Sequence, residues 1–311
     1  MNGTVIETTT RFRAAAITAA VASWALVAVG GIVRASASGL GCPDWPLCHG
    51  RPIPKSTKTS IIEFSHRGTA AIVTALVVLV AVMAWRSYRA RRDILVPALA
   101  ALVLVPIQAL LGAIVVWLEL PSWIVGVHFV VGMVFMGTTV AAAAAAFRGP
   151  EPRATPGFAA LARWTLATAF ALVMAGAVVV SSHADEACGK EWPLCNGTFV
   201  AGGGDATAQV IHRLLAYTAA ALALALAVQA WRGRGPRFMG TLPLLATAAQ
   251  MSIGISLVLV GEGSAHEPLE ALHVAGAGTV WALLVALVVI AVPSRSADHR
   301  AAAIVTTARA Q

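Results

Sequence analysis

Eight runs of about twenty apolar residues follow one another along this chain, and they restrict its fold more than any other feature. The runs cover approximately residues 14–34, 62–85, 94–117, 123–147, 160–181, 208–231, 239–261 and 268–292. A helix of about 20 apolar residues spans the hydrocarbon core of a bilayer, roughly 30 Å thick. None of the runs shows the polar–apolar alternation of a membrane β-barrel strand. The sequence therefore predicts an all-α integral membrane protein with eight transmembrane helices.

The distribution of charge predicts how these helices are oriented. Fifteen of the 22 basic residues, all of them arginines, fall in loops and tails on one side of an eight-span arrangement. The other side holds ten of the 14 acidic residues. Because arginine is retained on the cytoplasmic side, we expect a multi-pass protein of the cell membrane with both termini in the cytoplasm. The net charge of +8 then reports topology, and nucleic acid is not an expected partner.

The chain also contains an internal repeat. A shift of about 146 residues places the loop CPDWPLC, which begins at Cys42, on the loop CGKEWPLC, which begins at Cys188. The same comparison matches Gly30 with Gly176, Gln108 with Gln250, and Gly112 with Gly254. Each half contains an even number of spans, so both halves have the same orientation in the membrane. We expect two parallel-repeat four-helix bundles, residues 1–147 and 164–311, joined by a cytoplasmic linker at 148–163.

All four cysteines lie in these two loops, on the side predicted to be outside the cell. Disulfides persist in such an oxidising compartment. Pairing Cys42 with Cys48, and Cys188 with Cys195, would close two small loops. Such pairs could be structural staples or redox-active disulfides. A metal site is disfavoured because each loop offers at most one nearby histidine.

Four of the eight histidines are preserved by the repeat: His66, His128, His212 and His273. Each is predicted about one turn inside the outer end of an even-numbered span, so the four should share one depth. Ionisable residues within membrane spans are costly and usually functional. Two imidazoles on opposite faces of a planar ring suit a six-coordinate heme, whereas zinc requires three or four ligands around one point. We therefore predict two bis-histidine heme sites, one inside each bundle. The remaining histidines are expected in outer loops or the tail, and not as ligands: His49, His183, His266 and His299.

The two halves differ beside these histidines. Glu63 stands three residues before His66 on the same helical face, whereas the matching residue before His212 is Gln209. A carboxylate beside a heme edge can move protons or stabilise a developing cation. The alternative is a solvated acid at a helix entry, which is favourable there without any catalytic role.

Three arginines are expected near the same depth. Arg67 and Arg213 follow the repeated histidines directly, and Arg34 has Val180 as its counterpart in the second half. Guanidinium binds carboxylate in a fork, so these arginines are candidate partners of heme propionates. The alternative for Arg67 and Arg213 is that they reach to the lipid interface without a ligand.

Taken together, these features resemble heme A synthases over roughly residues 14–292. The features are eight spans in two halves, the WPLC loops, the E-x-x-H-R motif at 63–67, and histidines entering the fourth, sixth and eighth spans. The resemblance implies an oxidoreductase that oxidises the C8 methyl group of heme O to a formyl group, giving heme A for cytochrome oxidase. By the same resemblance, His66 and His128 bind the substrate heme O, His212 and His273 hold a resident heme b cofactor, and Glu63 is catalytic.

The resemblance extends to the cysteine loops and the partners. Cys42 and Cys48 match a pair implicated in substrate handling or electron transfer, and Cys188 and Cys195 match a pair read as structural. Five residues separate the first pair and six the second, so the loops are not expected to be interchangeable. The implied partners are heme O, membrane lipid, an electron acceptor that the sequence does not identify, and heme O synthase as a candidate.

Other functions fit parts of the pattern. A di-heme cytochrome b that passes electrons between quinol and a partner protein accounts for the four histidines but gives Glu63 no role. A transporter accounts for the repeat and predicts no heme. A thiol oxidoreductase accounts for the cysteines and leaves the histidines idle.

Overall fold

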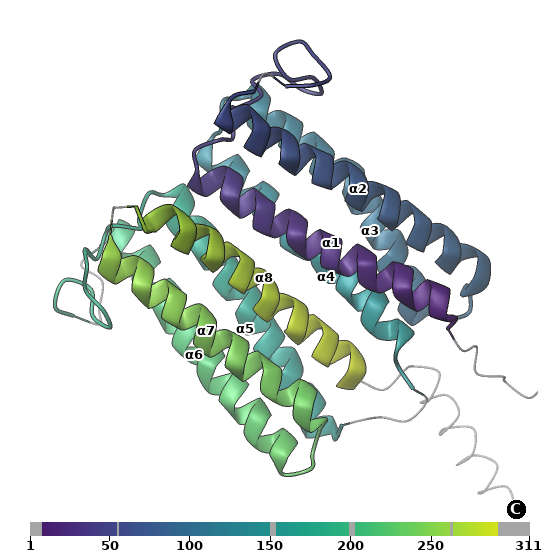
Figure 1. Ribbon diagram of the computed structural model, residues 1–311. Coiled ribbons are helices and arrows are strands. Elements are labelled where there is room, and N and C mark those ends of the chain that lie inside the picture. Colours follow the sequence, from purple (N-terminus) through teal and green to yellow (C-terminus); the bar gives the residue numbers. More distant parts are fainter. Residues whose placement is uncertain (1–7, 55, 150–153, 199–202, 262–263, 292–311) are drawn as a thin grey trace, which may run out of the picture.

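The computed structural model describes residues 8–54, 56–149, 154–198, 203–261 and 264–291, and over these residues it consists of eight helices and their connecting loops (Figure 1). The helices are α1 Thr10–Ala35, α2 Lys58–Ser87, α3 Arg92–Trp117, α4 Ser122–Ala146, α5 Pro156–Ser181, α6 Asp205–Trp231, α7 Arg237–Val260 and α8 His266–Ala291. Each is long and apolar enough to cross a membrane. The prediction of an all-α protein with eight spans is confirmed, with every boundary within four residues of the predicted one.

Several helices begin earlier than their apolar runs because a capping threonine starts them. The hydroxyl groups of Thr9, Thr57 and Thr155 accept hydrogen bonds from the backbone N–H three residues further on, at 3.2–3.3 Å. Such a cap satisfies one of the N–H groups that a helix start leaves free. The extra turns of α1 and α2 are polar, which is why hydropathy did not reveal them. Helix α5 begins at Pro156, four residues before its predicted span, so residues 156–163 of the predicted linker are helical.

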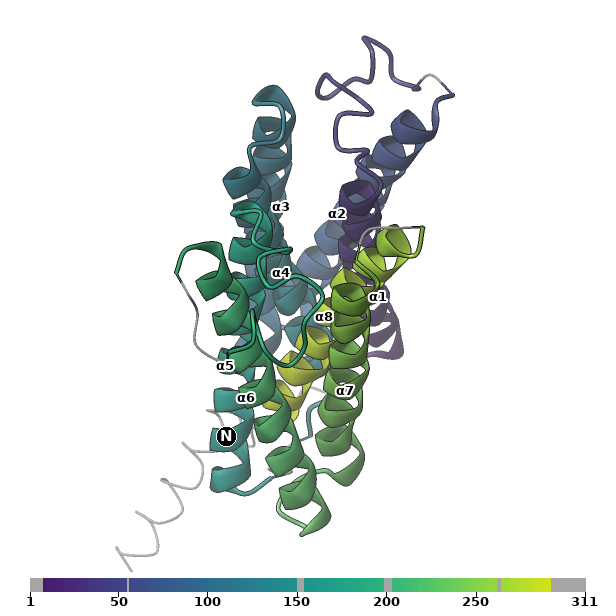
Figure 2. The ribbon, with the colours of Figure 1, turned by 90° about the vertical axis from the view of Figure 1, so that its left-hand side faces the viewer.

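The helices pack as two rings of four. In the first half α1 contacts α2, α2 contacts α3, α3 contacts α4, and α4 contacts α1. Helices α5, α6, α7 and α8 form the second ring in the same order. The two rings meet where α1 and α4 contact α8 and where α4 contacts α5 (Figures 1 and 2). Each ring therefore has its own interior, and α8 is the main bridge between them.

Two tryptophans fix this seam. The indole Nε1 of Trp24 on α1 donates to Thr279 Oγ1 at 3.0 Å, and that of Trp281 on α8 donates to Met133 O at 2.7 Å. Gly137 leaves room for the indole of Trp281, since a Cβ on residue 137 would lie 2.9 Å from Trp281 Nε1. A buried indole N–H needs such a partner, so these bonds set how the halves align.

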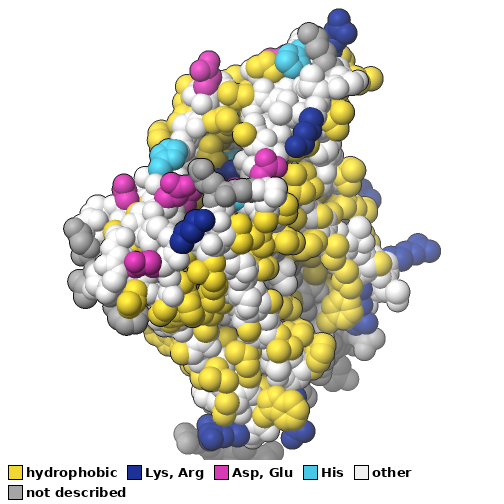
Figure 3. All heavy atoms as spheres, turned by 60° about the vertical axis from the view of Figure 1, so that its left-hand side comes forward, with side chains coloured by type: hydrophobic (Ala, Val, Ile, Leu, Met, Phe, Trp, Pro, Cys, Tyr) yellow, Lys and Arg dark blue, Asp and Glu magenta, His cyan; other side chains and the backbone are white. Residues whose placement is uncertain are grey.

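The two ends of the molecule differ in charge. The long loops after α1 and α5 project from one end, and the described chain begins and finishes at the other (Figure 1). On the face shown in Figure 3, acidic side chains gather at the loop end, hydrophobic side chains cover the middle, and basic side chains lie at the opposite end. This band is the surface expected of helices that face lipid.

Candidate functional site

The four repeated histidines lie on the four even-numbered helices at a common depth. His66, His128, His212 and His273 are the ninth, seventh, eighth and eighth residues of α2, α4, α6 and α8. They are therefore about two turns inside the loop end, not one, because the helices begin earlier than predicted. All four side chains are half-buried.

Each histidine ring rests against a glycine of the preceding helix. A Cβ built on the glycine would lie 2.9–3.5 Å from the ring Cε1 atom. The pairs are Gly30 with His66 at 3.3 Å, Gly112 with His128 at 3.5 Å, Gly176 with His212 at 3.2 Å, and Gly254 with His273 at 2.9 Å. The bare backbone lets each imidazole lie close against the neighbouring helix, which fixes the position of the ring.

The polar atoms of these rings are largely unsatisfied within the protein. Nδ1 of His66 and of His128 is buried without a hydrogen-bond partner. His212 Nδ1 also lacks one in good geometry, although the Leu172 backbone lies close to the ring. Buried polar atoms are normally paired, so unpaired ones indicate a group that the protein alone does not supply. Within each half the two rings lie near each other, His66 near His128 and His212 near His273.

A glutamine supports the second histidine of each half. Gln108 Nε2 on α3 donates to His128 O at 3.2 Å, and Gln250 Nε2 on α7 donates to His273 O at 2.8 Å. Gln250 Nε2 also lies 3.1 Å from His273 Nδ1. These bonds hold the backbone and, in the second half, the ring of the histidine in place.

These observations fit heme better than a metal ion. Among the described residues, no group of three or more His, Cys, Asp or Glu side chains could hold a metal ion. Each half instead offers two imidazoles, each packed against a glycine, on helices of the same four-helix bundle. Paired imidazoles suit the two axial positions of a heme iron. The residues that would hold it are His66 with His128, and His212 with His273.

Glu63 lies beside the first pair and is bound to Arg67. The Glu63 side chain is only 8% exposed, and its Oε1 lies 3.1 Å from Arg67 Nε. The solvated-acid alternative is therefore not what the structure contains. The same guanidinium donates to three carbonyls of the first cysteine loop, at 2.8–2.9 Å: Cys42 O, Asp44 O and Leu47 O. Arg67 thus ties Glu63 to the loop that covers it.

The corresponding group in the second half is simpler. Gln209 Nε2 donates to Asp185 O at 2.9 Å, and Arg213 donates to Leu194 O at 2.5 Å. Both side chains are buried, but neither position carries a carboxylate. Beside His212 the second site therefore keeps the arginine and has an amide in place of the acid.

Arg34 is paired across the seam between the halves. Its guanidinium forms an ion pair with Glu270 of α8, three residues before His273. Asp185, near the second cysteine loop, also attracts Arg34. All three predicted propionate partners thus have protein acceptors in this structure, and their binding to propionates stays a prediction.

The two predicted disulfides are present. Cys42 is bonded to Cys48, and Cys188 to Cys195. All four cysteines are buried, although their loops are largely exposed. In the first loop the Asp44 carboxylate accepts from Gly50 N at 2.7 Å and from His49 N at 2.5 Å. The Gly50 N–H, and after it the His49 N–H, holds the pKa of Asp44 below its usual value.

The other histidines lie away from the paired rings. His49 is in the first loop, where its Nε2 lies 3.0 Å from Gly41 O. His183 lies two residues beyond the end of α5. His266 was expected in a loop but is the first residue of α8, with Nδ1 3.1 Å from Gly261 O. His299 lies outside the described residues.

Comparison with known proteins identifies the family. The chain matches the model of the COX15-CtaA family, a cytochrome oxidase assembly protein, over residues 13–61 and 55–288. It is 32% identical to the heme A synthase of Halalkalibacterium halodurans over 248 residues, which are 75% of this chain and 82% of that protein. The chain belongs to the heme A synthase family. The heme A synthase of Shouchella clausii is 28% identical over 244 residues, which cover 74% of this chain and 81% of that one.

Membership of the heme A synthase family makes the protein an oxidoreductase, as the sequence resemblance predicted.

Sequence reasoning missed some residues of the site, although the signals were present. The four glycines and two glutamines were recognised only as markers of the repeat. Glu270 was missed although Glu270 and His273 repeat the E-x-x-H spacing of Glu63 and His66.

Proposed function

We propose that the protein converts heme O to heme A by oxidising the C8 methyl group to a formyl group. The substrate binds in the first half between His66 and His128. A resident heme b is held in the second half by His212 and His273. Family membership supports the reaction, and the glycine-seated rings with unpaired polar atoms support the two heme sites.

The observation that carries the assignment of the reaction to the first half is the acid beside His66. Oxidation of a methyl group releases protons and builds positive charge beside the ring. Glu63 can accept a proton at the carboxylate oxygen that does not face Arg67, or stabilise that charge. Arg67 holds the other oxygen, Oε1, at 3.1 Å and so fixes the orientation of the carboxylate. Gln209, its counterpart, can do neither.

The second half then receives the electrons that the oxidation releases. Heme b, when bound there, can accept electrons and pass them on singly. The two sites lie at one depth, and the four-helix rings that contain them meet along α8. Trp24 and Trp281 keep that seam in register through their hydrogen bonds to the opposite half.

The arrangement of the chain in the membrane is part of the same proposal. The halves are parallel repeats, supported by the matching rings of four and by the equivalent glycine–histidine pairs. The basic end carries the first and last described residues and faces the cytoplasm, in accordance with arginine retention on that side. The disulfide loops, and both heme sites beneath them, then face the outer surface of the cell membrane.

The test is Glu63→Gln, which gives the first half the amide of the second. We expect the heme content to stay unchanged and the turnover of heme O to fall by about 100-fold or more, in the range of a lost acid–base group. The matched control is Gln209→Glu, which should leave turnover unaffected. Pigments extracted after incubation with heme O would be separated to measure conversion. Unchanged turnover in Glu63→Gln would remove the acid from the mechanism.

The same assay distinguishes the proposed reaction from the main alternative function. A di-heme cytochrome b would bind both hemes and transfer electrons, but it would return heme O unconverted from wild-type protein. That result would overturn the proposed reaction while leaving the heme ligands in place.

A further inference from the structure

The ion pair between Arg34 and Glu270 joins the two halves near the depth of the histidines. Arg34 lies four residues, about one turn, beyond Gly30 on α1, and Gly30 packs against the His66 ring. Glu270 lies three residues before His273 on α8. The pair is therefore about one helical turn from the level of both candidate heme sites.

A close approach of α1 to α8 brings this pair beside the second site. A Cβ built on Gly31 would lie 2.9 Å from the Cβ of Val274, the residue that follows His273. Because Gly31 has no side chain, α1 rests directly on the turn of α8 that carries this histidine. Arg34, three residues further along α1, is then placed to meet Glu270.

The matching position of the repeat carries no charge. Arg34 has Val180 of α5 as its counterpart. Glu270 has Val125 of α4, three residues before His128. Helices α4 and α5 also contact each other, so this seam closes there without an ion pair. Ion pairs withdrawn from water add little stability compared with apolar side chains. Packing of the halves therefore does not account for the pair between α1 and α8.

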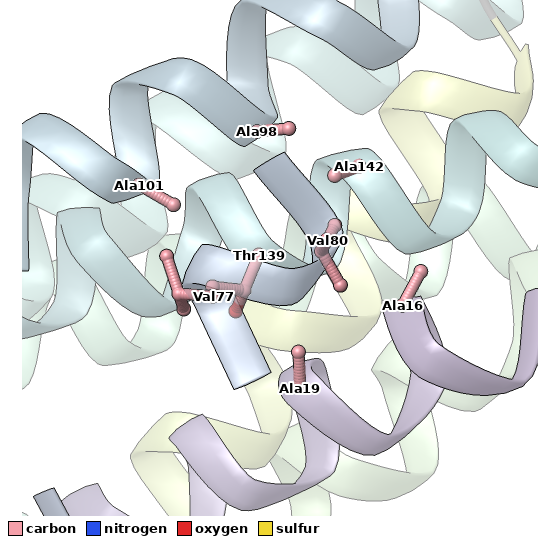
Figure 4. A pocket seen from close by; sticks show the side chains of 8 residues that line it. All are labelled: Ala16, Ala19, Val77, Val80, Ala98, Ala101, Thr139 and Ala142. Carbon is pink, nitrogen blue, oxygen red and sulfur yellow. The ribbon is translucent and has the colours of Figure 1, made fainter. Parts of the chain in front are cut away.

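The surroundings allow these charges to act on a nearby iron. Away from the loops, the interior of the first bundle is closed by apolar side chains such as Ala19, Val77 and Ala101, each 2% exposed (Figure 4). Leu226 and Leu284 are equally buried in the second bundle. Charges interact more strongly across such a medium than across water. An anion near a heme iron favours its oxidised form and lowers its reduction potential, whereas a cation raises the potential.

We propose that Arg34, a residue of the substrate half, sets the reduction potential of the resident heme by neutralising Glu270. The inference rests on the proposed function, because it requires heme b between His212 and His273. An unpaired carboxylate one turn from His273 would make this heme a weaker electron acceptor. Paired with Arg34, the same carboxylate leaves the second site able to take the electrons that oxidation of heme O releases.

The test measures the midpoint potential of the resident heme, by redox titration of the purified holoprotein followed by absorbance. Glu270→Gln leaves Arg34 unpaired, so the potential should rise. Arg34→Gln leaves Glu270 unpaired, so the potential should fall. The double variant removes both charges and should lie close to wild type.

The size of each shift follows from distance and exposure. Side chains three residues apart on a helix have Cβ atoms about 5–6 Å apart, which places the Glu270 carboxylate on the order of 10 Å from an iron bound to His273. Removing a charge at that distance changes the equilibrium constant for reduction about tenfold, or about 59 mV for one electron. The Arg34 side chain is 37% exposed and that of Glu270 18%. Water therefore screens the arginine more, and Arg34→Gln should change the constant only about threefold.

Two further variants distinguish this role from that of a structural contact. Glu267→Gln removes the same charge from α8 one turn nearer the loop end, at an exposed position, and should leave the potential unchanged. Arg34→Lys keeps the cation and should restore most of the potential that Arg34→Gln loses.

Shifts of the same sign in Glu270→Gln and Arg34→Gln, or no shift in either, would overturn the inference, because the pair would then only join two helices. Weaker heme binding at an unchanged potential in Arg34→Gln would overturn it too. If one single variant does not fold, the sign of the shift in the other decides, with Glu267→Gln as its reference. Wild-type protein without a heme that depends on His273 would contradict the proposed function, whereas such a heme with an unresponsive potential would contradict this inference alone.

Discussion

In the first half, Arg67 donates to three carbonyls of its cysteine loop and to Glu63. In the second half, its counterpart Arg213 donates to one loop carbonyl, Leu194 O. Arg67 therefore joins the first loop to the acid beside His66, whereas the residue before His212 that matches Glu63 is the amide Gln209. The difference concentrates chemical groups in the half assigned to the substrate.

The bundles below the loops differ in the opposite sense. A Cβ built on Gly254 in the second half would lie 2.9 Å from His273 Cε1, whereas one built on Gly112 in the first half would lie 3.5 Å from His128 Cε1. A resident cofactor favours a tight site that is filled once, and a substrate that must enter and leave favours a looser one. This contrast gives predictions that can be made in matched pairs.

The largest effect is expected from removing a ligand in each half. His273→Ala should lower heme b affinity by more than about 100-fold, because even indirect partners of a metal ligand are worth 10–100-fold. His128→Ala should leave the resident heme in place and abolish heme O conversion. Heme bound per protein, measured by absorbance of the extracted pigment, checks both. Loss of the resident heme in His128→Ala alone would reverse the assignment of the halves.

A smaller effect should follow from adding one methyl group behind a histidine. In Gly254→Ala the new Cβ would lie 2.9 Å from His273 Cε1, too close without a shift of the ring. Such overpacking costs about 1–3 kcal/mol, and bound heme b should be lost more readily on dilution. In Gly112→Ala the distance is 3.5 Å, an ordinary contact. That variant should retain its function and gain slightly in helix stability. Equal loss of function in Gly254→Ala and Gly112→Ala would contradict the difference in glycine–histidine packing between the halves.

The contacts of Arg67 with the first cysteine loop predict a third, smaller difference between the halves. Lysine cannot reproduce the planar fork of arginine, so Arg67→Lys should free at least two of the loop carbonyls. The Cys42–Cys48 disulfide should then be reduced several-fold faster by an added phosphine, while Cys188–Cys195 is unaffected. Arg213→Lys loses one carbonyl contact and should accelerate reduction of the second disulfide less. Mass spectrometry of alkylated peptides would follow each disulfide separately.

The sequence predicted the helices because each is a single apolar run, and lipid imposes that pattern directly. It predicted the histidine pairs because the repeat preserved them. Helix starts were placed too late, since capping threonines and polar first turns leave no hydropathy signal. The glycines were visible as repeat markers, but only the packing of adjacent helices gives them a role.

Contacts between the halves were the least accessible to sequence reasoning. The ion pair between Arg34 and Glu270 joins residues from the first and last helices, and the partner of Trp24 is equally remote. A repeat aligns the halves with each other and contains no information on how they dock.

The smallest effect concerns the loops themselves. Asp44 accepts two backbone N–H groups, and its counterpart Glu191 accepts one, from Gly197 at 2.7 Å. Because these bonds lower the pKa of Asp44, led by that from Gly50, the carboxylate stays ionised below the ordinary aspartate value of about 3.9. Its contribution is thus complete above that pH and lost as the pH falls through the lowered pKa. Hydrogen-exchange protection of the His49 and Gly50 amides should hold at about pH 5 and decline only below about pH 3.9. Asp44→Asn should show low protection at every pH, and a wild-type decline beginning well above that value would contradict the assignment.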